Sequence, residues 1–105
     1  MAETMLTHVV YFTLKDNSPK AIRRQLELCK EHLTEHPDTV YFAVGTRTRG
    51  LNRDVNDKEF DVALHVVFKN RAAHDQYQTD PRHVKFIEES KPNWAKARVF
   101  DADVE

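Results

Sequence analysis

The sequence predicts an α+β fold whose elements follow the order strand, helix, strand, strand, helix, strand. Three observations lead to this prediction. Residues alternate between two faces in the segments 6–14 and 60–68, which is typical of strands. Apolar residues recur at steps of three and four over residues 22–33, which indicates an amphipathic helix. Ser18-Pro19 and Asp80-Pro81 each place a capping side chain before a proline, a frequent beginning of a helix.

The first predicted strand spans Leu6 to Leu14, and both of its faces are largely apolar. One face carries Leu6, His8, Val10, Phe12 and Leu14, and the other carries Thr7, Val9, Tyr11 and Thr13. The first helix should begin after Ser18 and end near Pro37. Its apolar stripe consists of Ile22, Leu26, Cys29 and Leu33 and should cover one face of a sheet.

In the middle of the chain the sequence predicts two strands, at 40–45 and 60–68, joined by a long polar loop at 46–59. Three arginines lie in this loop, and they either line a ligand site or simply face solvent beside nearby acidic residues: Arg47, Arg49 and Arg53.

Asn70 should cap a helix that runs through Tyr77. A further helical segment should follow Asp80-Pro81 towards Glu89 and end at Pro92. The last strand is expected at about 97–102.

Two right-handed strand–helix–strand units joined by a hairpin form a four-stranded antiparallel sheet with both helices on one side. This is the ferredoxin-like βαββαβ arrangement, and the chain of 105 residues has room for one such domain, 1–105, with a core at about 6–101. No element remains to cover the other face, which should carry Val9, Tyr11, Tyr41, Ala43, His65 and Val67. We therefore expect a homodimer that pairs through this face into a dimeric α/β barrel.

Composition excludes several classes of partner. Sixteen basic and seventeen acidic residues give a net charge of −1, so nucleic acid is not expected. There is no apolar run long enough for a membrane span and no secretory signal, so we expect a cytoplasmic protein. No flavin, nicotinamide or phosphate motif is present, and we expect no cofactor. The single cysteine, Cys29, lies on the apolar helix stripe and is interpreted as a core residue.

Several segments together resemble the stress-responsive dimeric α/β-barrel (Dabb) family over about residues 6–101. They are HVVYFTLK at 8–15, Gly45, FD at 60–61, VFK at 67–69, Tyr77 and DPRHVKF at 80–86. The resemblance implies a dimeric barrel. It also implies a pocket between sheet and helices, which in a plant polyketide cyclase of this family is lined by residues that match His8, Tyr77 and His83. Two other cyclase residues, a histidine and a tyrosine, fall at Val62 and near Cys29 or Lys30 here.

We predict His83, Tyr77 and His8 as catalytic residues. Apolar contacts to a ligand are expected from Phe12, Phe42, Val62, Leu64 and Phe86. His83 would be the third residue of its helix, where the dipole disfavours an imidazolium, so a neutral base is expected. Each of the three predicted catalytic residues also has a purely structural interpretation, as a core or turn residue.

Other histidines are weaker candidates. His32 and His36 have metal-ligand spacing on a helix, but two ligands do not define a site, and no metal site is predicted. The resemblance adds that some family members hold a magnesium-type ion at the end of this helix. His65 is expected at the dimer interface and His74 in solvent. Trp94 is interpreted as an anchor of the last strand.

Three functions remain open at this point. The leading hypothesis is a homodimer that binds a small, largely apolar or phenolic molecule, with cofactor-independent proton transfer through His83 and Tyr77. One alternative is a non-catalytic stress or interaction protein whose pocket is filled by side chains. Another is a cofactor-free monooxygenase. Whether the protein is an enzyme is therefore left open.

Overall fold

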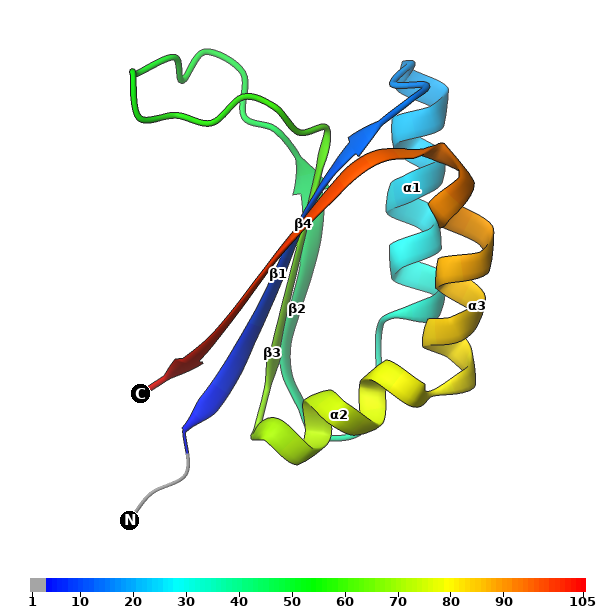
Figure 1. Cartoon of the computed structure of the whole chain (residues 1–105), viewed down its shortest axis with the longest axis vertical. Helices are drawn as coiled ribbons and strands as arrows, with labels where there is room; N and C mark the ends of the chain where they lie inside the picture. Colours follow the sequence, from blue (N-terminus) through cyan, green and yellow to red (C-terminus); the bar gives the residue numbers. More distant parts are fainter. Residues whose placement is uncertain (1–3) are drawn as a thin grey trace.

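The computed structural model describes residues 4–105 and confirms the predicted α+β architecture (Figure 1). Four antiparallel strands form one sheet in the order β2-β3-β1-β4. The elements are β1 (Met5–Leu14), α1 (Pro19–His32), β2 (Thr39–Thr46), β3 (Val62–Phe68), α2 (Arg71–Thr79), α3 (Pro81–Ser90), the 3-10 turn η1 (Lys91–Asn93) and β4 (Trp94–Val104). This is the ferredoxin-like arrangement expected from the order of the elements.

The predicted capping residues begin the helices. The Ser18 hydroxyl accepts a hydrogen bond from the Ala21 amide, and the Asn70 side chain accepts one from the Ala73 amide. The Asp80 carboxylate accepts from the Arg82 amide at 2.8 Å, so α3 begins at Pro81 as expected.

Two elements, α1 and β4, differ most from their predicted boundaries, and β3 begins at Val62 rather than at residue 60. Helix α1 ends at His32 rather than near Pro37, because the following turn uses left-handed backbone at Glu35 (φ 61°) and Asp38 (φ 60°). Strand β4 is longer than 97–102, since it pairs with β1 along its length, from Leu14 opposite Trp94 to Met5 opposite Val104. The differences in α1 and β4 arise from tertiary pairing and turn geometry that local sequence patterns do not carry.

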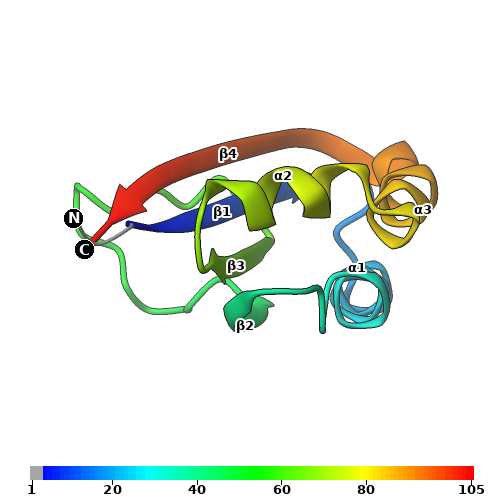
Figure 2. The same ribbon diagram turned by 90° about the horizontal axis from the view of Figure 1, so that it is seen from below.

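All three α-helices lie on one side of the sheet (Figure 2). Burial alternates along β1, and the buried residues face the helices. The core between the two layers contains fully buried side chains from the sheet and from each α-helix, among them Phe12, Cys29, Val66, Tyr77 and Phe86.

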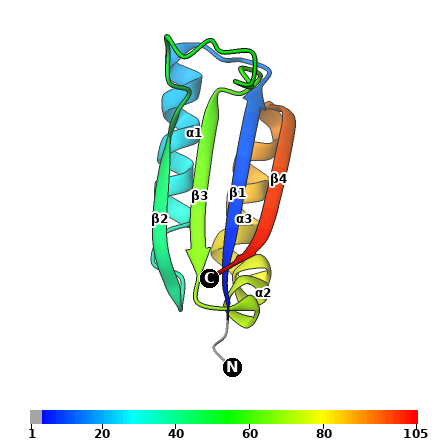
Figure 3. The same cartoon turned by 90° about the vertical axis from the view of Figure 1, so that its left-hand side faces the viewer.

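The opposite face of the sheet is uncovered (Figure 3). Strand register places all six predicted residues there: Val9 and Tyr11 on β1, Tyr41 and Ala43 on β2, and His65 and Val67 on β3. Phe100 joins them from β4, with its ring 5.9 Å from that of Tyr11. Tyr41 and Phe100 are more than half exposed, so much of this face is apolar and is not covered by a helix among residues 4–105.

Among residues 4–105, none of the helices is both long enough and apolar enough to span a membrane.

Candidate functional site

A cavity of about 310 Å³ lies between the inner face of the sheet and helices α2 and α3. Most of its wall is apolar and includes Val10, Leu33, Ile87, Trp94, Ala97 and Val99. Its polar lining consists of His8, His74, Tyr77, Gln78, His83 and Asp101. A volume of this size accommodates a small organic molecule.

The structure brings the three predicted catalytic residues, His8, Tyr77 and His83, to this one cavity. The predicted apolar contacts divide into two groups. Phe12, Leu64 and Phe86 line the cavity, whereas Phe42 and Val62 do not. The cavity opens towards β1 and β4, while Phe42 lies on β2 at the opposite edge of the sheet and Val62 is fully buried in the core. Sequence alternation identifies the inner face of a strand but does not tell which part of that face is open.

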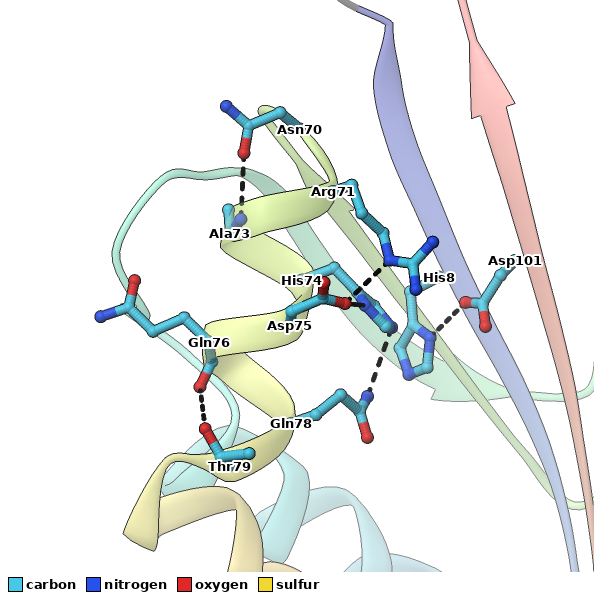
Figure 4. Close-up of polar contacts among 10 residues, drawn as sticks. All are labelled: His8, Asn70, Arg71, Ala73, His74, Asp75, Gln76, Gln78, Thr79 and Asp101. Atoms are coloured by element: carbon cyan, nitrogen blue, oxygen red, sulfur yellow. Dashed lines mark hydrogen bonds and ion pairs between the residues drawn. The ribbon is translucent and has the colours of Figure 1, made fainter.

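His8 and Asp101 form a close pair across β1 and β4 (Figure 4). The His8 Nδ1 lies 2.5 Å from Asp101 Oδ1, a distance at which the ring donates its Nδ1 hydrogen to the carboxylate. Burial lowers the pKa of His8, and the Asp101 carboxylate opposes that shift. Asp101 was not predicted from the sequence. Strand pairing could have suggested it, because Asp101 lies opposite His8 on the inner face of the last strand.

His74 lies in the cavity wall, and the prediction that it faces solvent was wrong. Its side chain is 13% exposed and its ring centroid is 5.3 Å from that of His8. The His74 Nδ1 donates to Asp75 at 3.0 Å. Helical spacing could have predicted this position. His74 precedes Tyr77 by three residues and Gln78 by four, which places all three side chains on one helix face.

Tyr77 is 2% exposed and lies between the histidines of the site. Its ring centroid is 4.7 Å from that of His83 and 5.9 Å from that of His8. The Tyr77 hydroxyl is buried and has no hydrogen-bond partner among residues 4–105. Because burial disfavours the phenolate, it raises the pKa of Tyr77, and the hydroxyl is a neutral donor at physiological pH.

His83 is the third residue of α3, as predicted from the Asp80 cap. Its pKa is lowered, and the largest cause is burial. Further lowering comes from the neighbouring imidazoles of His8, His36 and His74, while a backbone hydrogen bond at Gln78 acts in the opposite direction. The imidazole is therefore neutral near pH 7 and suited to accept a proton.

Cys29 is fully buried, and burial raises the pKa of its thiol to about 12. A thiol with this pKa stays protonated, which agrees with its interpretation as a core residue.

His32 and His36 do not converge on a shared ligand position. The His32 Nε2 lies 3.0 Å from Glu89, and the His36 Nε2 donates to the His32 backbone oxygen at 2.8 Å. The expected spacing on one helix fails because α1 ends at His32.

The loop between β2 and β3 lies apart from the cavity, on the side of the sheet opposite the helices (Figure 1). Arg47, Arg49 and Arg53 are not among the cavity's lining residues, and Arg53 bonds to Asn56 within the loop. Trp94 lines the cavity beside Phe12 at 5.0 Å between ring centroids, and its indole nitrogen is buried without a hydrogen-bond partner in the described part of the chain.

The fold and the cavity define a ferredoxin-like α+β domain with a site between sheet and helices. Residues 6–104 match the model of the stress responsive A/B barrel domain, and the chain belongs to this family. No curated protein matches the chain at a significant level.

Solved structures have the same fold. A Dabb family protein from Mesorhizobium loti is 25% identical with a TM-score of 0.77, covering 95% of this chain and 96% of that one. A dimeric ferredoxin-like protein of unknown function from Thermobifida fusca is 14% identical with a TM-score of 0.79, covering 97% and 92%. The hydroxynitrile lyase of Passiflora edulis is 21% identical with a TM-score of 0.77, covering 97% and 94%.

Proposed function

We propose that this protein is a homodimer that binds a small, uncharged, largely apolar or phenolic molecule in the cavity between sheet and helices. The observation that carries the proposal is the open volume of about 310 Å³ beside His8, Tyr77 and His83. A non-catalytic protein with a side-chain-filled pocket, the main alternative, would have no such volume. The lining contains no lysine or arginine, which favours an uncharged ligand over an anionic one.

The polar groups of the cavity support proton transfer as its chemistry. His83 is a neutral base, and Tyr77 offers a hydroxyl that has no partner among residues 4–105. With their rings 4.7 Å apart, one group can accept a proton from a bound molecule while the other donates a hydrogen bond to its oxygen. The hydroxynitrile lyase among the similar structures is an enzyme on the same fold, which supports an enzymatic role by analogy only.

Dimerisation is part of this proposal because the outer sheet face exposes apolar side chains that a partner surface would bury. Val9, Tyr11 and Phe100 form an apolar patch on adjacent strands, and a second copy of the chain offers a matching patch. The similar Thermobifida fusca protein is described as dimeric.

The test is calorimetric titration of the protein with an alkylphenol, in buffer containing EDTA. We expect binding to the unmodified protein and loss of binding or turnover in His83→Ala, with fold and dimer retained. If His83 is a general base for a probe that turns over, the rate should fall about 100- to 10,000-fold. Val84→Ala is the matched control, since Val84 is the next residue of α3 and does not line the cavity.

Equal binding by His83→Ala and the unmodified protein would contradict a functional role for His83. Failure of a chemically diverse set of phenols, aldehydes and ketones to bind would contradict the proposed function as a whole. The non-catalytic alternative would then be the better account.

A further inference from the structure

We propose that His8, His74 and Asp101 form a binding site for a divalent transition-metal ion at the edge of the cavity. One ligand atom from each residue lies within 4.8 Å of the other two. Two imidazoles and one carboxylate form a donor set that suits zinc and iron(II) and leaves coordination positions open. This inference goes beyond the proposed function, which depends on His83 and Tyr77.

The three ligands come from three different elements of a rigid framework (Figure 4). His8 lies on β1, Asp101 is its direct neighbour on β4, and His74 lies on α2 above them. The His8 side chain is 7% exposed and the His74 side chain 13%, so neighbouring residues hold both imidazoles in place. A site assembled in this way is largely formed before the ion arrives, which reduces the entropic cost of binding.

The geometry requires small adjustments, because the three ligand atoms lie within 4.8 Å of one another but not at metal-site spacing. Metal bonds of about 2.0–2.2 Å place two ligand atoms of a tetrahedral site roughly 3.4 Å apart. The His8 Nδ1 and Asp101 Oδ1 are now 2.5 Å apart, as expected for a hydrogen bond. Asp101 must therefore withdraw by about 1 Å to admit an ion, and the His8 proton must move from Nδ1 to Nε2 so that Nδ1 offers its lone pair. Its side chain is 44% exposed and is free to make this adjustment.

The surroundings of His74 are the strongest argument for a metal ligand. Histidines that bind metals usually donate their second ring nitrogen to a carboxylate, which orients the ring and makes it more basic. The His74 Nδ1 makes this bond to Asp75 at 3.0 Å, and Arg71 in turn holds Asp75 at 2.8 Å. The chain Arg71–Asp75–His74 leaves the Nε2 of His74 unprotonated, and this nitrogen accepts a hydrogen bond from the Gln78 side-chain amide that an ion would replace. Gln78, whose side chain is 3.5 Å from this nitrogen, provides a further polar group.

A second cluster in the described residues provides an internal comparison. Glu31, His32 and Glu89 also bring three ligand atoms within 4.8 Å of one another. That cluster has only one imidazole, whereas the cavity cluster has two, and imidazole is a preferred ligand of zinc and iron(II). The cavity cluster is therefore the better transition-metal site.

The test uses Zn²⁺ in calorimetry and Co²⁺ in absorption spectroscopy, on full-length protein first freed of metal with EDTA. We expect one ion per chain, with visible Co²⁺ bands that indicate nitrogen and oxygen ligands. His74→Ala and Asp101→Asn should each weaken binding at least about 10-fold, and Asp75→Asn should weaken it about 10- to 100-fold. Gln76→Ala is the matched control on the same helix, because Gln76 is exposed and lies outside the cluster.

Unchanged Zn²⁺ affinity in folded His74→Ala or folded Asp101→Asn would overturn the proposal, as would the absence of Zn²⁺ binding to the unmodified protein. Loss of binding in His32→Ala alone would assign the ion to the Glu31–His32–Glu89 cluster and would also overturn it. The metal site and the proposed function can be contradicted independently of each other. Alkylphenol binding is measured in EDTA, where no metal is available, and so tests only the proposed function.

Discussion

The two faces of the sheet carry side chains that alternate along the same strands, yet the two sets have different roles. On β1, His8, Val10 and Phe12 face the helices and line a cavity, whereas Val9 and Tyr11 face outward. The inner face combines apolar walls with imidazoles, a phenol and a carboxylate. The outer face carries aromatic and aliphatic residues together with Arg98, which pairs with Asp57 of the β2–β3 loop, and no helix among residues 4–105 covers it (Figure 3).

Neighbouring residues of one strand therefore belong to two different surfaces. The inner-face residues line the candidate binding site, and the outer-face residues lie in the proposed dimer interface. A polar side chain on the inner face is held in a partly dry environment, where its pKa shifts, as for His8 and His83. On the outer face, apolar side chains gain free energy only when another surface covers them. Substitutions on the two faces should therefore affect different measurements.

The largest effect is expected from a charge on the outer face. Val67→Asp places a carboxylate on the outer sheet face, within the proposed dimer interface, where burial without a partner costs several kcal/mol. Light scattering at micromolar concentration should then return the mass of the single chain, 12.3 kDa, instead of twice that mass. Val84→Asp, on the exposed side of α3, is the control and should stay dimeric. A dimeric, equally stable Val67→Asp would show that the outer face is not the interface.

A smaller and more selective effect is expected from Tyr77→Phe on the inner face. Removing a buried hydroxyl that has no partner among residues 4–105 should leave the free energy of unfolding unchanged or raise it by about 1 kcal/mol. Alkylphenol binding should weaken roughly 2- to 10-fold, which corresponds to one neutral hydrogen bond. Denaturant unfolding and calorimetry measure the two quantities. A loss of stability with unchanged binding would instead indicate a structural role for the hydroxyl.

The smallest effect is expected from pH. The pKa of folded His83 lies below its ordinary value of 6.5, so the unfolded chain takes up a proton first as pH falls. The stability contributed by neutral His83 is present above pH 6.5 and is lost as pH falls from 6.5 towards the folded pKa. His8 has the same sign, because burial lowers its pKa as well.

His83→Gln should accordingly show a shallower loss of Tm below pH 6.5 than the unmodified protein, by a few degrees at most. A steeper loss in His83→Gln would contradict the direction of the pKa shift. A thermal melt series between pH 5 and pH 8 makes the comparison.

Local patterns predicted the fold well because strand alternation, helix caps and proline positions act over a few residues. The order of elements then determined the sheet topology and the uncovered face. The site was only partly predictable. His8, Tyr77 and His83 were found through resemblance, whereas Asp101 and His74 join them through strand register and helix packing between distant segments. The open part of the inner face depends on how α2 and α3 sit over β4, which no local pattern describes.

The most direct test of ligand binding in the cavity is an amide NMR titration of the dimer with the alkylphenol. We expect shifts that saturate with ligand and cluster on the cavity residues His8, Tyr77, His83 and Val99, with none on the outer-face residues Val9 and Val67. Shifts confined to the outer face, or no saturable shifts at millimolar ligand, would contradict binding in the cavity.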